Sequence, residues 1–269
     1  MTHRSSDFVT IQGINVFYEV SGEGAPLLLI HAGIADHRMW AANLEELAQQ
    51  YQVITYDVPG FGRTQLAPVT FSQHGITAGL LNHLGHQQAN LVGISYGGRI
   101  AIDFALAYPT RVHKLILGAP SVDGEEPTKQ ILAFWEEEDE LLEAGKLEEA
   151  TELNLRLWVD GIYRQPHKVD AAVRQLVYTM QYEAFQVDQP AGTKIERSYP
   201  PAIGRLTEIQ APTLLIVGDL DLPEKLELVD HLLESIPNAA RAVIPRTAHL
   251  MSMEAPRQFN QLVFSFLEN

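Results

Sequence analysis

The sequence predicts an α/β fold: a doubly wound, mostly parallel sheet with a helical cap insertion. Two observations lead to this prediction. Short apolar runs alternate with stretches of helical periodicity, and runs without polar interruption are typical of strands covered by helices on both faces. In addition, the 90 residues 119–208 all lie between the fourth run and the fifth, whereas a strand–helix–strand unit needs only about 30. The six runs are Leu27–Ile30, Gln52–Tyr56, Asn90–Ile94, Lys114–Gly118, Thr213–Val217 and Arg241–Ile244.

The segment before the first run differs from the rest of the chain. Phe8–Val20 alternates in polarity and contains Gln12 and Gly13, a pair typical of a tight turn, so it predicts two short strands. Between the later runs, apolar residues recur at helical spacing. Trp40, Leu44 and Leu47 form one such set, and Ile100, Phe104 and Ala107 form another.

The long gap predicts a helical cap, and we expect residues 1–120 and 204–269 to form the core and residues 121–203 the cap. One helix is expected from an apolar stripe that begins after Pro166, and a second from Leu147 to Trp158. The stripe is Val169, Ala172, Val173, Leu176, Val177, Met180 and Ala184. The cap also carries Phe134, Trp135, Trp158, Tyr178 and Met180. We expect these residues to pack between its helices, with the lining of a pocket as the alternative. A cap over one edge of a core is a common place for a substrate pocket.

Composition excludes several classes of protein. The 269 residues include 34 acids and 19 Lys and Arg, a net charge of −15 that disfavours binding to nucleic acid. Cysteine is absent, so no thiolate can serve as nucleophile or metal ligand. No run approaches the ~20 apolar residues of a membrane span, and a cytoplasmic location is expected. Residues 123–152 hold 12 acids and two lysines, which predicts a solvated helix face.

One motif points to nucleophilic catalysis. Gly93-Ile94-Ser95-Tyr96-Gly97 follows the third run and opens the next helical stretch, the strand–turn–helix context that a G-x-S-x-G motif requires. At such a turn the serine hydroxyl stands above the sheet at the positive end of the helix, where a developing oxyanion is stabilised. Ser95 is therefore the predicted nucleophile.

A serine hydroxyl needs a general base, and the base needs an orienting carboxylate. His249 follows the last apolar run, and Asp221 follows Thr213–Val217, so both belong to loops at strand ends. We predict His249 as the base and Asp221 as the acid. Asp219 and Asp123 remain alternatives for the acid, although Asp219 is closer to the strand end and better placed to cap the turn.

The transition state also needs amide donors for its oxyanion. His31-Ala32-Gly33-Ile34 forms a turn of small residues after the first run, and its amides could complement that of Tyr96. Gly33 and Tyr96 are the predicted donors, with Ile34 as an alternative to Gly33. His31 is expected to pack within this turn. The 57–64 loop, rich in Gly and Pro, is expected to shape the pocket floor.

Taken in order, these motifs resemble the serine hydrolases of the α/β-hydrolase superfamily, in its cap-bearing branch. The resemblance covers nearly the whole chain, and it implies the same roles for Ser95, Asp221, His249, Gly33 and Tyr96. The family usually has glycine where Ala32 stands. A serine at the elbow also disfavours the dehalogenases and epoxide hydrolases of this fold, because their nucleophile is a carboxylate.

We therefore expect a hydrolase that cleaves a small to medium carboxylic ester or lactone through an acyl-enzyme on Ser95, with no metal and no cofactor. The expected partner is a small-molecule substrate, with no nucleic acid and no membrane, and the oligomeric state stays open. Carbon–carbon bond hydrolysis or perhydrolysis on the same triad is an alternative. A ligand-binding sensor with slow turnover is another, and turnover numbers would separate it from an enzyme.

Overall fold

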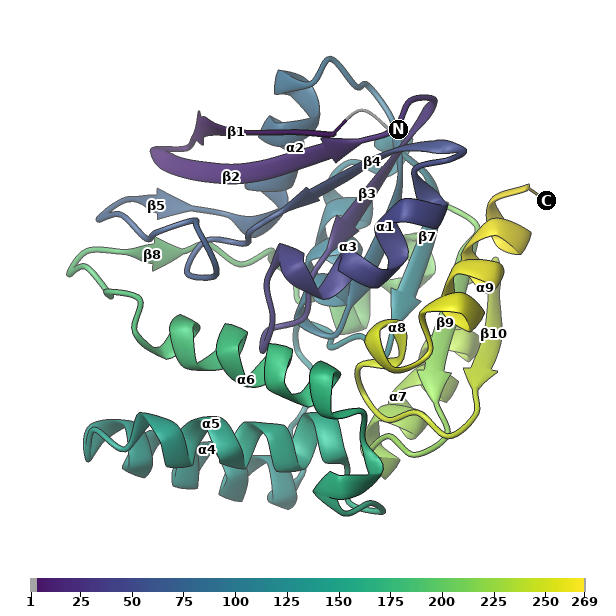
Figure 1. Ribbon diagram of the computed structural model, residues 1–269. Coiled ribbons are helices and arrows are strands. Elements are labelled where there is room, and N and C mark those ends of the chain that lie inside the picture. The colour runs from purple at the N-terminus through teal and green to yellow at the C-terminus, as the bar shows by residue number, and fades with distance from the viewer. Residues whose placement is uncertain (1–3, 269) are drawn as a thin grey trace.

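The computed structural model of the protein describes residues 4–268, which form an α/β structure around one eight-stranded sheet (Figure 1). The strand order is β1-β2-β4-β3-β6-β7-β9-β10. Two further short strands, β5 and β8, pair with each other outside this sheet. The strands are β1 Arg4–Ile11, β2 Ile14–Ser21, β3 Ala25–Ile30, β4 Tyr51–Tyr56, β5 Thr70–Phe71, β6 Ala89–Ile94, β7 Val112–Gly118, β8 Lys194–Ile195, β9 Thr213–Gly218 and β10 Ala239–Ile244.

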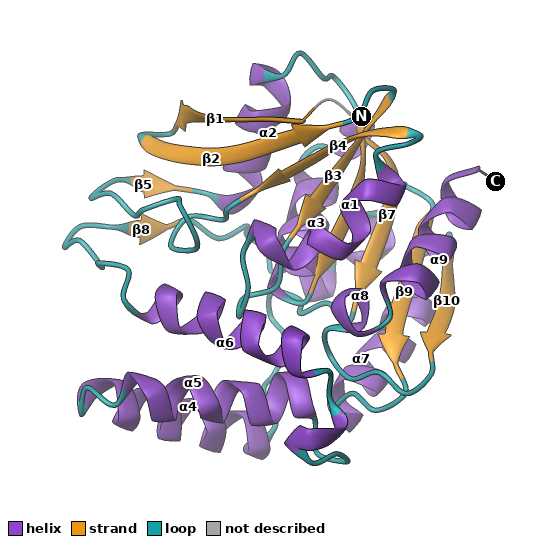
Figure 2. Cartoon of the chain, viewed as in Figure 1, coloured by secondary structure: helices purple, strands orange, loops and turns teal. Residues whose placement is uncertain are grey.

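Helices cover both faces of the sheet. Helices α1 and α9 pack together on the face seen in front in Figure 2, and α3 packs against β3, β6 and β7 on the other. No helix within residues 4–268 combines the length and the apolar character that crossing a membrane requires. The helices are α1 Ala41–Leu47, α2 Gln73–His83, α3 Tyr96–Ala107, α4 Lys129–Glu143, α5 Leu147–Leu155, α6 Ala171–Phe185, α7 Pro223–Ser235, α8 Met251–Glu254 and α9 Pro256–Glu268.

The direction of the strands confirms the predicted fold class. Strands β1 and β2 form an antiparallel pair that turns at Gln12 and Gly13, and β2 runs antiparallel to β4. The remaining pairs of the large sheet are parallel. Every residue of β6 and of β9 is buried, as expected for strands with helices on both sides.

The strand order alone indicates where a ligand would bind. Strands β3 and β6 are neighbours, but the chain proceeds from β3 to β4 on one side and from β6 to β7 on the other. Ligands of open α/β sheets bind at such a switch point, outside the carboxyl ends of the strands. Ser95 directly follows β6, and Gly33 lies shortly after β3.

The segment between β7 and β9 is mainly helical. Figure 1 shows α4, α5 and α6 layered on the side toward which the arrowheads of β7, β9 and β10 point. Two of these helices are capped at their N-termini by side chains. Thr128 accepts a hydrogen bond from the Ile131 amide, and Asp170 accepts from the amides of Ala172 and Val173. The returning chain then pairs with the core through β8 and β5. These helices therefore lie over the edge that carries Ser95.

Candidate active site

Ser95 occupies a strained turn between β6 and α3. Its backbone has φ 54° and ψ −115°, a conformation that costs a residue other than glycine roughly 1–3 kcal/mol. The Ser95 amide donates a 2.9 Å hydrogen bond to the carbonyl oxygen of Gly118 at the end of β7. The neighbouring strand thus holds the turn in place, and the Ser95 side chain lines a cavity outside the sheet.

Close backbone approach explains the two glycines that flank Ser95 in the motif. A Cβ atom on Gly97 would lie 2.3 Å from the carbonyl oxygen of Ile30, and one on Gly93 would lie 2.3 Å from the carbonyl oxygen of Gly97. Both distances are far below van der Waals contact. The sharp turn at Ser95 therefore requires glycine at both positions.

The structure brings His249 and Asp221 together. Asp221 follows β9 and is 1% exposed, and His249 follows β10 and is 2% exposed. The His249 Nδ1 atom lies 2.9 Å from Asp221 Oδ2 and 3.2 Å from Oδ1. A carboxylate only accepts, so Nδ1 carries a proton and neutral His249 keeps a lone pair on Nε2. Asp221 is itself held by the Leu222 amide, which donates to Oδ1 at 2.8 Å.

The free nitrogen of His249 is the chemically notable atom of this group. Nε2 is buried and has no hydrogen-bond partner among residues 4–268. His249 and Ser95 line the same cavity, of about 1050 Å³. No hydrogen bond joins the two side chains, and without substrate such contacts are often long. A buried, unpartnered base beside an elbow serine is an arrangement suited to nucleophilic catalysis.

The two alternative acids have other partners. Asp219 lies nearer the strand end, where its Oδ1 accepts a 2.5 Å hydrogen bond from the Arg246 amide and so caps the turn. Asp123 lines the cavity but forms an ion pair with Arg99. Of the three carboxylates weighed from the sequence, Asp221 is therefore the one that contacts His249.

The predicted oxyanion donors also lie together. A Cβ atom on Gly33 would be 3.3 Å from the Tyr96 Cβ, which places the two turns side by side. Tyr96 is the first residue of α3, where a helix leaves its amide groups without internal acceptors. Within the described chain, the amides of Gly33 and Ile34 make no hydrogen bond. The alternative between Gly33 and Ile34 therefore stays open.

A buried network of hydrogen bonds supports the turn formed by residues 31–34. His31 is fully buried, with Nδ1 2.8 Å from the Ala32 carbonyl oxygen, and its Nε2 accepts from the Val58 amide at 2.9 Å. Burial lowers the pKa of His31, which keeps the ring neutral in this role. Asp57 accepts from the amide of Arg63 in its own loop at 2.8 Å. These contacts confirm that His31 packs within the turn, and Pro59, Gly60 and Phe61 of the 57–64 loop line the cavity, as expected.

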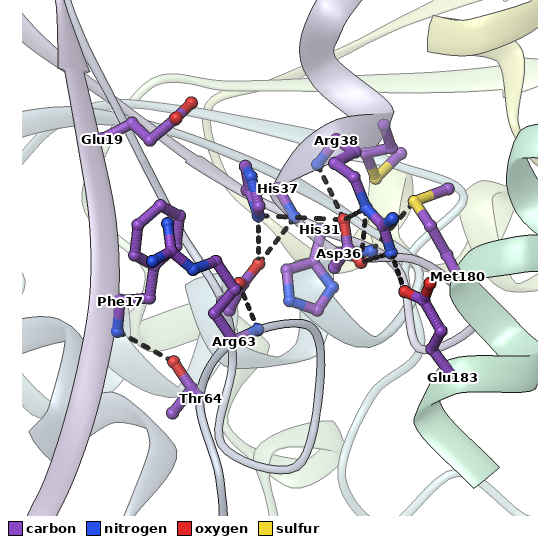
Figure 3. Close-up of polar contacts among 12 residues, drawn as sticks. Phe17, Glu19, His31, Asp36, His37, Arg38, Arg63, Thr64, Met180 and Glu183 are labelled. Atoms are coloured by element: carbon purple, nitrogen blue, oxygen red, sulfur yellow. Dashed lines mark hydrogen bonds and ion pairs between the residues drawn. The ribbon is translucent and has the colours of Figure 1, made fainter. Parts of the chain in front are cut away.

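The same network reaches α6. Figure 3 shows Arg38 between Asp36, which follows the oxyanion turn, and Glu183 on α6. Asp36 is 1% exposed, and Arg38 Nη2 lies 2.6 Å from its Oδ2. Arg38 therefore links the core turn to the helical insertion.

Asp36, His37 and Asp57 have potential ligand atoms within 4.8 Å of one another, a spacing that could hold a metal ion. Their atoms are already engaged within the protein. Asp36 binds Arg38, and Asp57 Oδ1 accepts from the amide and the Nδ1 atom of His37 at 2.9 and 2.6 Å. We interpret the group as an ion-pair network that supports the turn.

The insertion supplies much of the cavity wall. Phe134 and Trp158 pack edge-on against each other and also line the cavity, so both uses considered from the sequence apply to them. The exposed Trp135 lines the cavity as well. The lining is also acidic, with six carboxylates against three Lys and Arg side chains. The acids are Asp123, Glu125, Glu126, Glu138, Glu224 and Glu227, and the bases are Arg99, Arg197 and Lys225. Glu138 and Gln181, which line the cavity from α4 and α6, were not singled out from the sequence.

The comparisons with known proteins now decide the family, because residues 25–256 match the model described as the alpha/beta hydrolase fold. The chain belongs to the α/β-hydrolase family. A 2-hydroxy-6-oxononadienedioate/2-hydroxy-6-oxononatrienedioate hydrolase of Paraburkholderia phymatum is 31% identical, over 94% of this chain and 91% of that protein. A 2-hydroxy-6-oxo-6-phenylhexa-2,4-dienoate hydrolase of Burkholderia cepacia is 28% identical, over 98% and 97%.

Solved structures agree on the fold of this α/β-hydrolase. A thermophilic esterase of Thermogutta terrifontis is 26% identical, with a TM-score of 0.82 over 98% of both chains. An enol-lactonase of Burkholderia xenovorans is 18% identical, with a TM-score of 0.77 over 98% of this chain and 100% of the other. Membership in this family supports an enzyme of the hydrolase class.

Proposed function

We propose that the protein is a serine hydrolase that cleaves an uncharged or cationic carboxylic ester or lactone by acyl transfer. The observation that carries the proposal is the His249 ring. Its Nδ1–H is fixed on Asp221, its Nε2 is buried without a partner, and it lines the same cavity as the strained Ser95. This arrangement matches the requirements for an activated serine nucleophile.

In the proposed first step, Ser95 Oγ attacks the substrate carbonyl while its proton passes to His249 Nε2. The Tyr96 amide and that of Gly33 or Ile34 donate to the resulting oxyanion. His249 then returns the proton to the leaving alcohol, and the acyl group stays on Ser95. In the second half, His249 takes a proton from water, the hydroxide attacks the acyl-enzyme, and Ser95 leaves with the proton. Asp221 stabilises the charged ring in both halves.

Charge on the cavity wall favours this class of substrate over a dicarboxylate. Six acids against three bases line the cavity, and Asp123 and Glu125 already neutralise Arg99 and Lys225. An anionic substrate would meet net repulsion in such a cavity, whereas a neutral ester would not. We also propose that residues 121–203 act as a cap domain, that a small molecule is the natural partner, and that the protein works in the cytoplasm.

The test is hydrolysis of p-nitrophenyl esters from acetate to laurate by the wild type and by Ser95→Ala. We expect turnover that disappears in the variant, with a chain-length optimum set by the cavity. A folded wild-type protein that hydrolyses no ester in the series would overturn the proposal.

Carbon–carbon bond hydrolysis is the second candidate, because several relatives named for that activity align over nearly the whole chain. The same triad could serve it. The test is to supply a 2-hydroxy-6-oxo-dienoate and follow the loss of its absorbance. A kcat/KM that exceeds the best ester value would replace the ester proposal with this one.

A further inference from the structure

An aromatic wall leads from the catalytic base into the insertion. The Trp158 ring lies against His249, with ring centroids 4.7 Å apart, and meets Phe134 edge-on at 5.9 Å. Both aromatic residues line the cavity, as does Glu138. Glu138 follows Phe134 by four residues on α4, so the two side chains share one face of that helix.

Glu138 is a half-buried carboxylate of the insertion and has no cationic partner among residues 4–268. Its hydrogen bond comes from the Asn154 side-chain amide. Burial raises the pKa of Glu138, with the Asn154 bond acting in the opposite direction, and no Lys or Arg contributes. By contrast, arginine or lysine side chains pair with Asp123, Glu125, Glu152, Asp160, Glu183 and Glu254.

Gln181 is a second, independent sign of a missing partner. The residue is 5% exposed and lines the cavity from α6, yet its Oε1 atom is buried without any hydrogen bond. A buried acceptor left unpaired costs about 1–3 kcal/mol. Asn154 cannot help, because its side-chain nitrogen already donates to Glu138 and to the Ala150 carbonyl oxygen. Within the cavity, Gln181 therefore lacks a hydrogen-bond donor, and Glu138 lacks a positive charge beside it.

We propose that this wall is a specificity subsite for a protonated amine of the substrate, with Glu138 and Gln181 as its acceptors. The inference rests on the proposed serine hydrolase function and names its substrate class. The amine lies at the far end of an apolar chain that packs along Trp158 and Phe134, while the scissile carbonyl lies at Ser95. The carboxylate attracts the charge and accepts one N–H bond, and Gln181 Oε1 accepts where the amine carries a second N–H.

The test compares two p-nitrophenyl esters of equal shape at pH 8. One is 6-(dimethylamino)hexanoate, whose tertiary ammonium donates one N–H, and the other is 7-methyloctanoate, in which a neutral carbon replaces the nitrogen. For the wild type, we expect kcat/KM to favour the cationic ester by about 10- to 100-fold, the size of a charge-assisted hydrogen bond. Equal values for the two esters would overturn the proposal.

Substitutions on α4 test which residue causes the preference for the cationic ester. Glu138→Gln keeps the shape and removes the charge, so the ratio of the two kcat/KM values should fall by about tenfold. Glu137→Gln is the matched control, because Glu137 is the exposed neighbour on the same helix and should leave the preference intact. A preference that survives Glu138→Gln would show that the amine is bound elsewhere.

A binding measurement separates this inference from the proposed function. Calorimetry with protonated N,N-dimethylhexylamine should detect binding to the wild type and to Ser95→Ala, and much weaker binding to Glu138→Gln. If neither ester is hydrolysed but the amine binds in this pattern, the subsite stands and the proposed function fails. If the neutral ester is hydrolysed but the amine does not bind, the function stands and the subsite is wrong.

Discussion

The carboxyl edge of the sheet and the helical insertion line the same cavity, and the polar groups they contribute differ in their partners. At the sheet edge, Asp57 and Asp221 have partners within the protein, whereas His249 Nε2 has none among residues 4–268. In the insertion, Glu138 lacks a cation and Gln181 Oε1 lacks a donor among the same residues. The comparison agrees with our proposal that the core carries the chemistry, whereas Glu138 and Gln181 are groups that a ligand would complete.

The proposed division of roles between core and insertion fails most clearly if Ser95 is not needed for activity. Ser95→Ala should lower kcat for p-nitrophenyl esters by about 10⁴-fold or more, because loss of the nucleophile leaves only the oxyanion donors and binding. Steady-state kinetics check this, with thermal unfolding as a control for folding. Retention of more than a few per cent of the activity would contradict the role of Ser95.

The next prediction concerns the carboxylate that orients His249. Asp221→Asn should lower kcat by about 10⁴-fold, because the amide can hold the ring in the tautomer that leaves Nε2 protonated. Asp219→Asn is the matched control, two residues away and engaged with the Arg246 amide, and it should keep most of the activity. The reverse ranking of these two variants would assign the orienting acid to Asp219.

Backbone crowding at the elbow predicts a stability effect in the core. Gly97→Ala should lower the free energy of unfolding by at least about 1–3 kcal/mol, since its Cβ would lie 2.3 Å from the Ile30 carbonyl oxygen. Gly204→Ala is the control, because no atom lies within 4 Å of a Cβ built there. Urea denaturation measures both, and an equal response would contradict the crowding argument.

The link between core and insertion is expected to be weaker. Arg38→Gln leaves the buried Asp36 without its cation and should reduce the free energy of unfolding by roughly 1–3 kcal/mol. Arg156→Gln removes a 3.5 Å contact between exposed side chains and should cost less than about 1 kcal/mol. A larger loss for Arg156→Gln in urea denaturation would mean that burial of Asp36 does not set the cost.

The smallest expected effect is a dependence of folding stability on pH. Burial alone would lower the pKa of His37, but the hydrogen bond and charge of Asp57 raise it overall. A raised histidine pKa adds stability that is present below about pH 6.5 and is lost as the pH rises through the folded-state value. The stability difference between wild type and His37→Gln should therefore be larger at pH 5.5 than at pH 9, by on the order of 1 kcal/mol. A difference that grows with rising pH would contradict this sign.

The sequence predicted the core because its signals there are local. Buried parallel strands leave continuous apolar runs, and the elbow leaves glycines on either side of Ser95, so both can be read without the tertiary structure. The chain order of Ser95, Asp221 and His249 then identified residues that lie far apart in sequence, of which Asp221 and His249 are in contact. The choice between Gly33 and Ile34 stays open, because neither amide has a hydrogen-bond partner among residues 4–268.

The cavity-lining residues of the insertion could not be identified from the sequence, and the reason is physical. Glu138 is one of 12 acids within 30 residues, and nothing local distinguishes it from exposed Glu137. Its burial depends on how α4 is rotated against α5 and on the contact with Asn154. For Phe134 and Trp158 the sequence could not decide between packing and lining a pocket, because their place in the cavity wall depends on where the helices lie over the sheet.

Covalent trapping tests the central claim, an activated serine at the sheet edge, most directly. Diethyl p-nitrophenyl phosphate should release one p-nitrophenolate per chain and leave a diethylphosphoryl group that peptide mass spectrometry assigns to Ser95. Esterase activity should disappear in parallel, and His249→Gln should react far more slowly. Phosphorylation of another residue, or full esterase activity in protein labelled at Ser95, would contradict the account.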